Sequence, residues 1–186
     1  IGVVWRGFRS KIGTARDGDL ADSSCEFCGM CVASCPTAAL VPKMALGKGR
    51  RWQRRAVTTT CSYCGVGCRF DLQVVDGRIV EVTSNWDAPA NRGVTCVKGR
   101  FGFDYVHHPD RLKTPLIRRG DKLVPATWDE ALDLVSTRLR DVRAAYGGGA
   151  IAALASAKCT NEENYVLQKL ARAVLGTHNV DHCARL

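Results

Sequence analysis

The sequence lacks any long apolar run. No stretch approaches the roughly 18 consecutive apolar residues that a membrane-spanning helix needs, so we expect no membrane segment in this chain. It also lacks an initiator methionine, since the first residue is Ile1. We therefore expect an internal piece of a longer protein, whose natural start and any targeting signal lie upstream. Hydrophobic residues make up 46% of the 186 positions, which is enough to bury a core.

Histidine and acidic residues are scarce. His107 and His108, two of the four histidines, have no cysteine or carboxylate pattern nearby, so we interpret both as surface or loop-packing residues. The 18 acidic residues against 27 Lys and Arg leave a net charge of +9, part of it in the run KGRRWQRR at residues 48–55. A basic run with a tryptophan is compatible with nucleic-acid binding. We favour a solvated linker between anionic cofactors, and expect no nucleic-acid partner.

Cysteine, by contrast, is abundant. The chain has ten, and their dense grouping is typical of metal binding in a reducing compartment rather than of disulfides, so we expect a cytoplasmic protein. Four thiolates, one per iron, are what a 4Fe–4S cluster of the cubane type requires. Gly65 and Gly67 would let the backbone bend around such a cluster. The organising group follows the pattern C-x2-C-x3-C-x27-C and comprises Cys61, Cys64, Cys68 and Cys96, with Lys98 two positions further on.

A structural zinc site is the alternative for this group. Zinc held by four cysteines also uses C-x2-C knuckles, but such sites usually combine two knuckles. Here the fourth cysteine stands alone in the sequence. A second cysteine group of iron–sulfur type also lies just upstream, so iron is the favoured metal.

The upstream group has the spacing C-x2-C-x2-C-x3-C-P and comprises Cys25, Cys28, Cys31 and Cys35, followed by Pro36. It resembles the bacterial ferredoxin run, in which the first three thiolates hold one 4Fe–4S cluster and the fourth holds a second cluster. No sister run precedes it in this chain, so we expect the missing ligands upstream. A single cluster held by all four cysteines is the alternative.

The remaining sequence predicts two hairpins and an α/β segment. Strands are expected at 56–60, 69–75 and 78–83, with an Asp76-Gly77 turn, and a short helix from Lys98 to about Val106. A second hairpin spans 116–124, and residues 1–20 are expected to be loop. Thr127 and Glu130 form a capping box that opens an amphipathic helix ending at Gly147. A buried strand at 150–155, a loop, and a helix over 162–175 then form a βα unit, whose ligands gather at the loop.

These motifs resemble a known family. The segments TTCSYCGVGC, TCVKGRFGFDY, SAKCTNEENY and NVDHCARL resemble the large subunit of molybdenum or tungsten bis-pterin formate dehydrogenases, over residues 56–186. The upstream ferredoxin run fits the extended forms that exchange electrons with a diaphorase partner and NAD, and ferredoxin is the other expected electron-transfer partner. Nitrate reductases and the large peripheral subunit of respiratory complex I share the four-cysteine domain and give the alternative interpretations, the latter as a non-catalytic electron-transfer subunit.

The resemblance implies roles for individual residues. Cys61, Cys64, Cys68 and Cys96 would hold the cluster nearest the active site, and Lys98 would lie between that cluster and the proximal pterin as an electron relay. Residues 158–161 would line the pterin cavity. Cys159 and Cys183 are expected to be buried, inert thiols and not ligands.

The resemblance further implies the reaction and the cofactors. The full-length enzyme would oxidise formate to carbon dioxide at molybdenum or tungsten held by bis-molybdopterin guanine dinucleotide, with at least two 4Fe–4S sites. The metal-ligating selenocysteine or cysteine would follow Leu186 directly, so this piece alone would be inactive. We hypothesise a reading frame closed at a UGA codon that is decoded as selenocysteine.

The expected fold class is therefore α+β passing into α/β. A partial ferredoxin-type iron–sulfur domain is expected at 1–46 and a basic linker at 47–55. A small β-rich four-cysteine domain is expected at 56–112, and the start of an α/β pterin-binding domain at 113–186.

Overall fold

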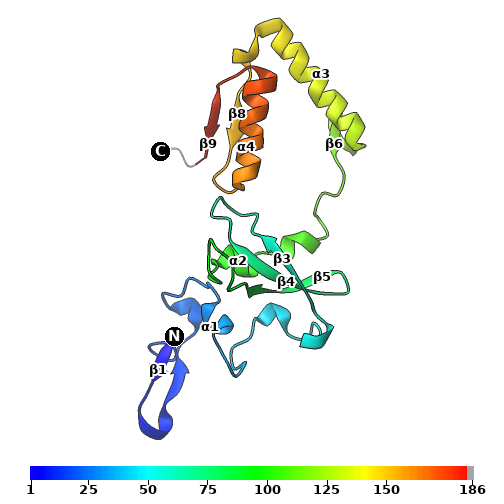
Figure 1. Ribbon diagram of the computed structural model, residues 1–186. Coiled ribbons are helices and arrows are strands. Elements are labelled where there is room, and N and C mark those ends of the chain that lie inside the picture. The colour runs from blue at the N-terminus through cyan, green and yellow to red at the C-terminus, as the bar shows by residue number, and fades with distance from the viewer. Residues whose placement is uncertain (184–186) are drawn as a thin grey trace. The chain divides into compact units, whose positions relative to one another are not determined.

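The computed structural model describes residues 1–183, so the last three residues of the NVDHCARL motif lie outside the described part. The chain divides into two compact units. The first unit comprises residues 1–61 and 68–105, and the second comprises residues 62–67 and those from 106 onward. Figure 1 shows the elements in chain order by colour. None of the helices within residues 1–183 combines the length and apolar character needed to cross a bilayer.

The centre of the first unit is a three-stranded antiparallel sheet in the order β3-β4-β5. Its strands are β3 (Arg55–Thr60), β4 (Arg69–Val75) and β5 (Arg78–Ser84), as the sequence predicts. Asp76 and Gly77 both have positive φ, 47° and 75°, which is the conformation that a two-residue hairpin turn requires. The hairpin register pairs Leu72 with Val82.

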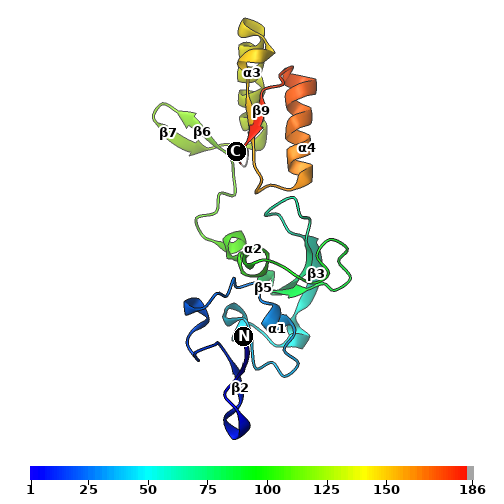
Figure 2. The same ribbon diagram turned by 90° about the vertical axis from the view of Figure 1, so that its left-hand side faces the viewer.

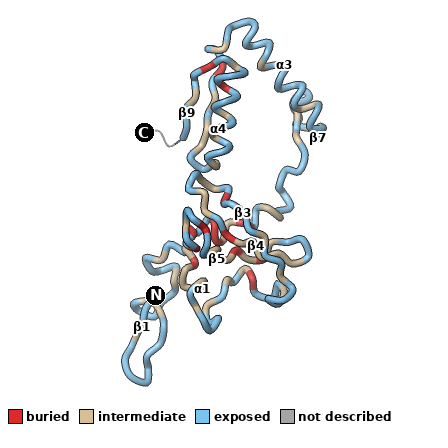
Figure 3. Tube along the Cα trace, viewed as in Figure 1, coloured by how far each residue is buried: buried red, intermediate tan, exposed pale blue. Residues whose placement is uncertain are grey.

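The core of the first unit lies on this sheet. Phe70, Val80 and Val82 are between 2% and 6% exposed, and Figure 3 shows buried residues gathered around β4 and β5. Helix α2 (Val97–Phe101) packs on β5. The expected single helix over 98–106 is interrupted at Gly102, the C-cap of α2, and resumes as a 3-10 helix at Asp104–His107.

The upstream part of the first unit contains short elements. Strands β1 (Gly2–Val4) and β2 (Lys11–Gly13) form an antiparallel hairpin, so the expectation of loop throughout 1–20 is wrong at these strands (Figure 2). Helix α1 (Met30–Ala33) follows the first cysteines. Single 3-10 turns complete this part at Gly7–Arg9, Leu20–Asp22, Lys43–Ala45 and Arg51–Gln53.

The basic segment 47–55 packs on the sheet. Arg54 forms an ion pair with Glu81, with the two side chains only 17% and 14% exposed, and also donates to the Gly49 carbonyl oxygen at 3.2 Å. A Cβ added at Gly49 would lie 3.0 Å from Val75. Trp52, in contrast, is 82% exposed. The segment is therefore solvated on one side and anchored by Arg54 on the other.

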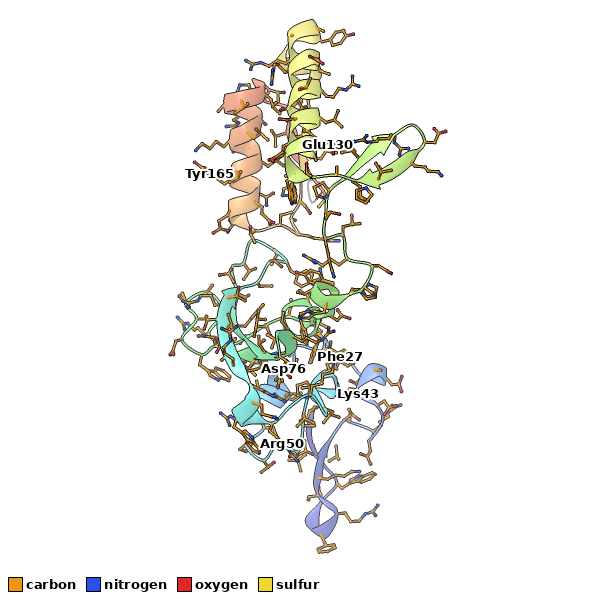
Figure 4. All side chains as sticks on the ribbon, turned by 90° about the vertical axis from the view of Figure 1, so that its right-hand side faces the viewer. Phe27, Lys43, Arg50, Asp76, Glu130 and Tyr165 are labelled. Carbon is orange, nitrogen blue, oxygen red and sulfur yellow. The ribbon has the colours of Figure 1, made fainter. Side chains whose placement is uncertain are left out.

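The second unit begins with the expected hairpin, β6 (Leu116–Arg119) and β7 (Lys122–Pro125). Helix α3 (Trp128–Tyr146) follows, and the Thr127 hydroxyl accepts from the Glu130 amide at 3.2 Å. The second half of the expected capping box does not form there, because the Glu130 carboxylate pairs with Arg119 instead. Glu130 is labelled on α3 in Figure 4.

The end of the second unit is a βαβ arrangement. Strands β8 (Ala153–Ala155) and β9 (Val180–His182) pair in parallel, joined by α4 (Asn161–Lys169) and a π-helical turn at Leu170–Leu175. Gly176 ends the helix with φ 71°, as predicted. The expected buried strand over 150–155 is shorter, and Leu154 is 82% exposed. Since this sheet has only two strands, little of it is covered.

Candidate functional site

Cys25 and Cys28 lie on a tight loop before α1, and Cys31 lies within that helix. Phe27 and Gly29 both adopt positive φ, 52° and 73°, which turns the chain around this loop (Figure 4). The Phe27 amide donates to Cys25 Sγ at 3.3 Å. Such N–H groups directed at sulfur are what stabilises thiolates bound to an iron–sulfur cluster.

Cys35 is surrounded by donors from the residues that follow it. Its Sγ lies 3.6 Å from Thr37 Oγ1. The backbone amide of Leu40, with the side chain and backbone of Thr37, lowers the pKa of Cys35 from 9.0 to about 7. The thiolate is the form that binds metal, so this loop favours the ligating state.

Three cysteines of the second group belong to the first unit. The Cys61 amide donates to the Cys68 carbonyl oxygen at 2.7 Å, which closes the loop over residues 62–67. Cys96 is the N-cap of α2. A Cβ added at Gly99 in α2 would lie 3.6 Å from Cys61 Sγ, so this helix packs directly beside the buried thiol. Lys98, one residue before Gly99, has an exposed side chain.

Cys64 lies on the loop over residues 62–67, in the second unit. Asn161, the first residue of α4, donates from Nδ2 to the Gly65 carbonyl oxygen at 2.8 Å. A Cβ added at Gly65 would come within 2.5 Å of Asn161 Oδ1, so a side chain at position 65 would push this contact apart. Asn161 therefore fixes the loop that carries Cys64.

The donor sets fit iron–sulfur clusters by their chemistry. Both groups supply thiols alone, and the Cys25 and Cys35 sulfurs face N–H groups. Among residues 1–183, no three His, Cys, Asp or Glu side chains gather closely enough to hold a single metal ion. A 4Fe–4S cluster distributes its four thiolates over four irons, so it does not require that arrangement.

The loop after β8 forms a second candidate region. The Asn164 Nδ2 donates to the Ser156 carbonyl oxygen at 3.0 Å, holding the loop against α4. A pocket of about 540 Å³ lies beside it, at the carboxyl ends of two parallel strands, where ligands of α/β proteins gather. Its lining residues are Ala155, Asn164, Gln168, Val180, Asp181 and His182.

The two thiols outside the cysteine groups lie near this loop. Cys159 is half-buried, whereas Cys183 is exposed, with Sγ 3.4 Å from Ser156 Oγ. The hydrogen bond from Ser156, then the Ala157 amide, lowers the pKa of Cys183. The expectation that both thiols are buried is therefore wrong for Cys183, whereas their being inert stays a prediction.

Sequence reasoning missed Asn164 and Arg100. Asn164 lies one helical turn after Asn161, the last of the residues 158–161 that were expected to line the pterin cavity. A polar side chain at that spacing is the sequence feature that could have indicated its contact with the loop. Arg100 lies four residues after Cys96 in α2 and is 3% exposed. Nothing in the local sequence distinguishes it from a surface arginine.

Two family models match the chain. Residues 54–108 match the molybdopterin oxidoreductase Fe4S4 domain, and residues 111–186 match the molybdopterin oxidoreductase domain. The chain therefore belongs to the molybdopterin oxidoreductases. A 4Fe–4S cluster and a molybdopterin, the cofactors expected from the sequence, are the groups that these two domains hold. The mixed α/β elements with small sheets agree with such a pair of domains.

Curated relatives show which members of this family the chain is similar to. The alpha subunit of F420-dependent formate dehydrogenase 1 from Methanococcus maripaludis is 51% identical over 70% of this chain and 19% of its own length. A putative formate dehydrogenase of Bacillus subtilis is 46% identical over 73% of this chain and 14% of its own. The alpha subunit of the NADPH-Fe(3+) oxidoreductase of Geobacter sulfurreducens is 40% identical over 100% of this chain and 21% of its own length. The first two relatives confirm the resemblance to the formate dehydrogenase large subunit, and the chain spans between 14% and 21% of the length of the three relatives.

Proposed function

We propose that this chain is part of a formate dehydrogenase large subunit and carries electrons between the pterin site and an external acceptor. The observation that carries the proposal is the fourfold cysteine pattern ending in Lys98, within a match to the family's Fe4S4 domain. The 51% identity to a formate dehydrogenase alpha subunit supports formate as the substrate.

In this proposal each cysteine of the second group binds one iron of a single cluster. The Cys61 thiol is buried beside Gly99, which keeps water from it, while Cys96 enters from the N-terminus of α2. The remaining ligands are Cys64 and Cys68. Lys98, exposed on the same helix, is the electron relay toward the pterin, because an ammonium group stabilises added negative charge.

The bound molybdenum or tungsten bis-molybdopterin guanine dinucleotide supplies the two-electron oxidation of formate to carbon dioxide. The part of this chain is to keep the loop after β8 in place, which Asn164 does through Ser156, and to hold the Cys64 loop through Asn161. Residues 158–161 then line the pterin site.

The upstream cysteines extend the electron path. Cys25, Cys28 and Cys31 bind three irons of a second 4Fe–4S cluster, and Cys35 belongs to a further cluster. Electrons leave through these centres to a diaphorase-type or ferredoxin partner. The domain limits of 1–46, 47–55, 56–112 and 113–186, and a cytoplasmic location, belong to the same proposal.

The experiment uses the full-length protein, purified without oxygen. We expect formate to reduce a viologen dye and the visible absorption of the clusters to bleach at the same time. Replacing Cys64 with Ala should remove one 4Fe–4S signal from the electron paramagnetic resonance (EPR) spectrum. Zinc in place of iron, or clusters that formate does not reduce, would contradict the proposal.

A second candidate comes from one of the relatives that match over the whole chain, the NADPH-Fe(3+) oxidoreductase alpha subunit. In that case NADPH, and not formate, would reduce the clusters of the full-length protein with its partner subunits. The relatives reported above lend no support to a nitrate reductase or to a subunit like that of complex I.

A further inference from the structure

Arg100 is a buried cation in the first unit. Arg100 is 3% exposed, and two of its side-chain nitrogens donate hydrogen bonds to the end of β5. Nη1 donates to the Val82 carbonyl oxygen at 3.0 Å and Nη2 to Ser84 Oγ at 2.8 Å. The third nitrogen, Nε, is buried and has no hydrogen-bond partner among the described residues. The guanidinium is thus fixed in place with one donor left over.

The upstream cysteine loop rests on this side chain. A Cβ added at Gly29 would lie 2.7 Å from Arg100 Cγ and 3.0 Å from Nε. Gly29 directly follows Cys28, and its φ of 73° suits glycine best. The absence of a side chain at position 29 is what allows the Cys25–Cys31 loop to approach the arginine so closely.

The charges around Arg100 are few. Burial lowers the pKa of Arg100, whereas Glu81 and the Cys28 thiol, as a thiolate, raise it. Glu81 already forms an ion pair with Arg54. An arginine keeps its charge in proteins, and burying an unbalanced charge is costly. A cluster held by thiolates carries net negative charge, which a buried cation beside Cys28 would offset.

We infer that Arg100 is a positioning residue that holds the Cys25–Cys31 loop on the four-cysteine domain and raises the reduction potential of the cluster bound by that loop. This rests on the proposed function only in that the loop must hold a cluster. An added electron makes the cluster more negative, and a fixed cation in a poorly solvated site stabilises that reduced state. Because Arg100 lies on the same helix as Cys96 and Lys98, it joins the two cysteine groups mechanically as well.

The test is a chemical redox titration of the full-length protein, followed by EPR, so that it does not depend on formate. In Arg100→Met, we expect the potential of the upstream cluster to fall by at least about 59 mV, the equivalent of a tenfold change in a one-electron equilibrium. Arg100→Lys keeps the positive charge, so the potential of the upstream cluster should stay close to the wild-type value. Arg78→Met removes an exposed arginine from β5 and is the matched control, with little shift expected.

Gly29→Ala provides the second variant, should Arg100→Met fail to fold. It leaves the arginine and its bonds to β5 in place but forces the loop away, so the same cluster should again shift to lower potential. Clusters present with unchanged potentials in Arg100→Met, or in Gly29→Ala if Arg100→Met is not recovered, would overturn the inference and leave the proposed function intact. Iron-free wild-type protein would overturn both.

Discussion

In the proposed electron path, neighbouring residues have separate roles. Lys98 and Arg100 are two residues apart on α2, yet one side chain is exposed and the other is buried under the upstream loop. The first is free to meet a cofactor, while the second is committed to Val82 and Ser84. One short helix therefore carries one positive charge that faces solvent and another that is buried.

Replacing Lys98 with Ala should leave both kinds of cluster formed but slow turnover of the full-length enzyme. We expect a loss of at least about tenfold, equal to about 1.4 kcal/mol, because the charge that stabilises the transferred electron is gone. Stopped-flow reduction of the clusters by formate measures it. Lys122→Ala, which removes an exposed lysine of β7, serves as the control. Equal rates in the two variants would show that Lys98 is not part of the electron path.

At the scale of elements, most of the strands and helices follow from sequence patterns. Alternating apolar residues around Asp76-Gly77 predict the β4–β5 hairpin, and Thr127 and Gly147 mark the ends of α3. Strands β1 and β2 escaped prediction because three residues carry too little periodicity. The run at 150–155 is apolar throughout, and from such a run neither strand length nor Leu154 exposure follows.

The candidate site also has one part that the sequence predicts and another part that only the fold shows. The cysteine spacings predict the ligand types, because a cluster dictates how many thiolates must occur and roughly where. The supporting contacts do not follow from spacing. Asn161 meets Gly65, and Arg100 meets Gly29, across long stretches of chain, and only the fold brings these residues together.

The contact between α4 and the Cys64 loop can be tested by removing one side chain. In Asn161→Ala, the 2.8 Å hydrogen bond to Gly65 is lost, and a bond of this kind contributes about 1 kcal/mol. We expect backbone amides of residues 62–67 to exchange with deuterium about fivefold faster in the full-length protein, as read by mass spectrometry. Thr127→Ala removes a comparable bond at α3 and should leave this loop unchanged.

At the scale of the whole molecule, the chain is a series of cysteine groups separated by packed segments. The basic stretch 47–55 lies between the two groups and is anchored through Arg54 and Glu81. The segment between the two cysteine groups is therefore held in place within the first unit.

Separate clusters should respond to separate mutations. Cys28→Ala in the full-length protein should abolish the EPR signal of the upstream cluster and leave that of the Cys61 group, and Cys64→Ala should do the reverse. Iron analysis should show a loss of about four irons in each case, since each cluster contains four. If both variants lost the same signal, the two cysteine groups would not hold separate clusters.

The close fit between Gly29 and Arg100 has a consequence for how this sequence can diverge. With the Cβ position of residue 29 only 2.7 Å from the arginine stem, a larger residue there is tolerated only when position 100 shrinks. Across homologous chains, a bulkier residue at position 29, which a φ of 73° already disfavours, should then occur only in chains that have lost the arginine.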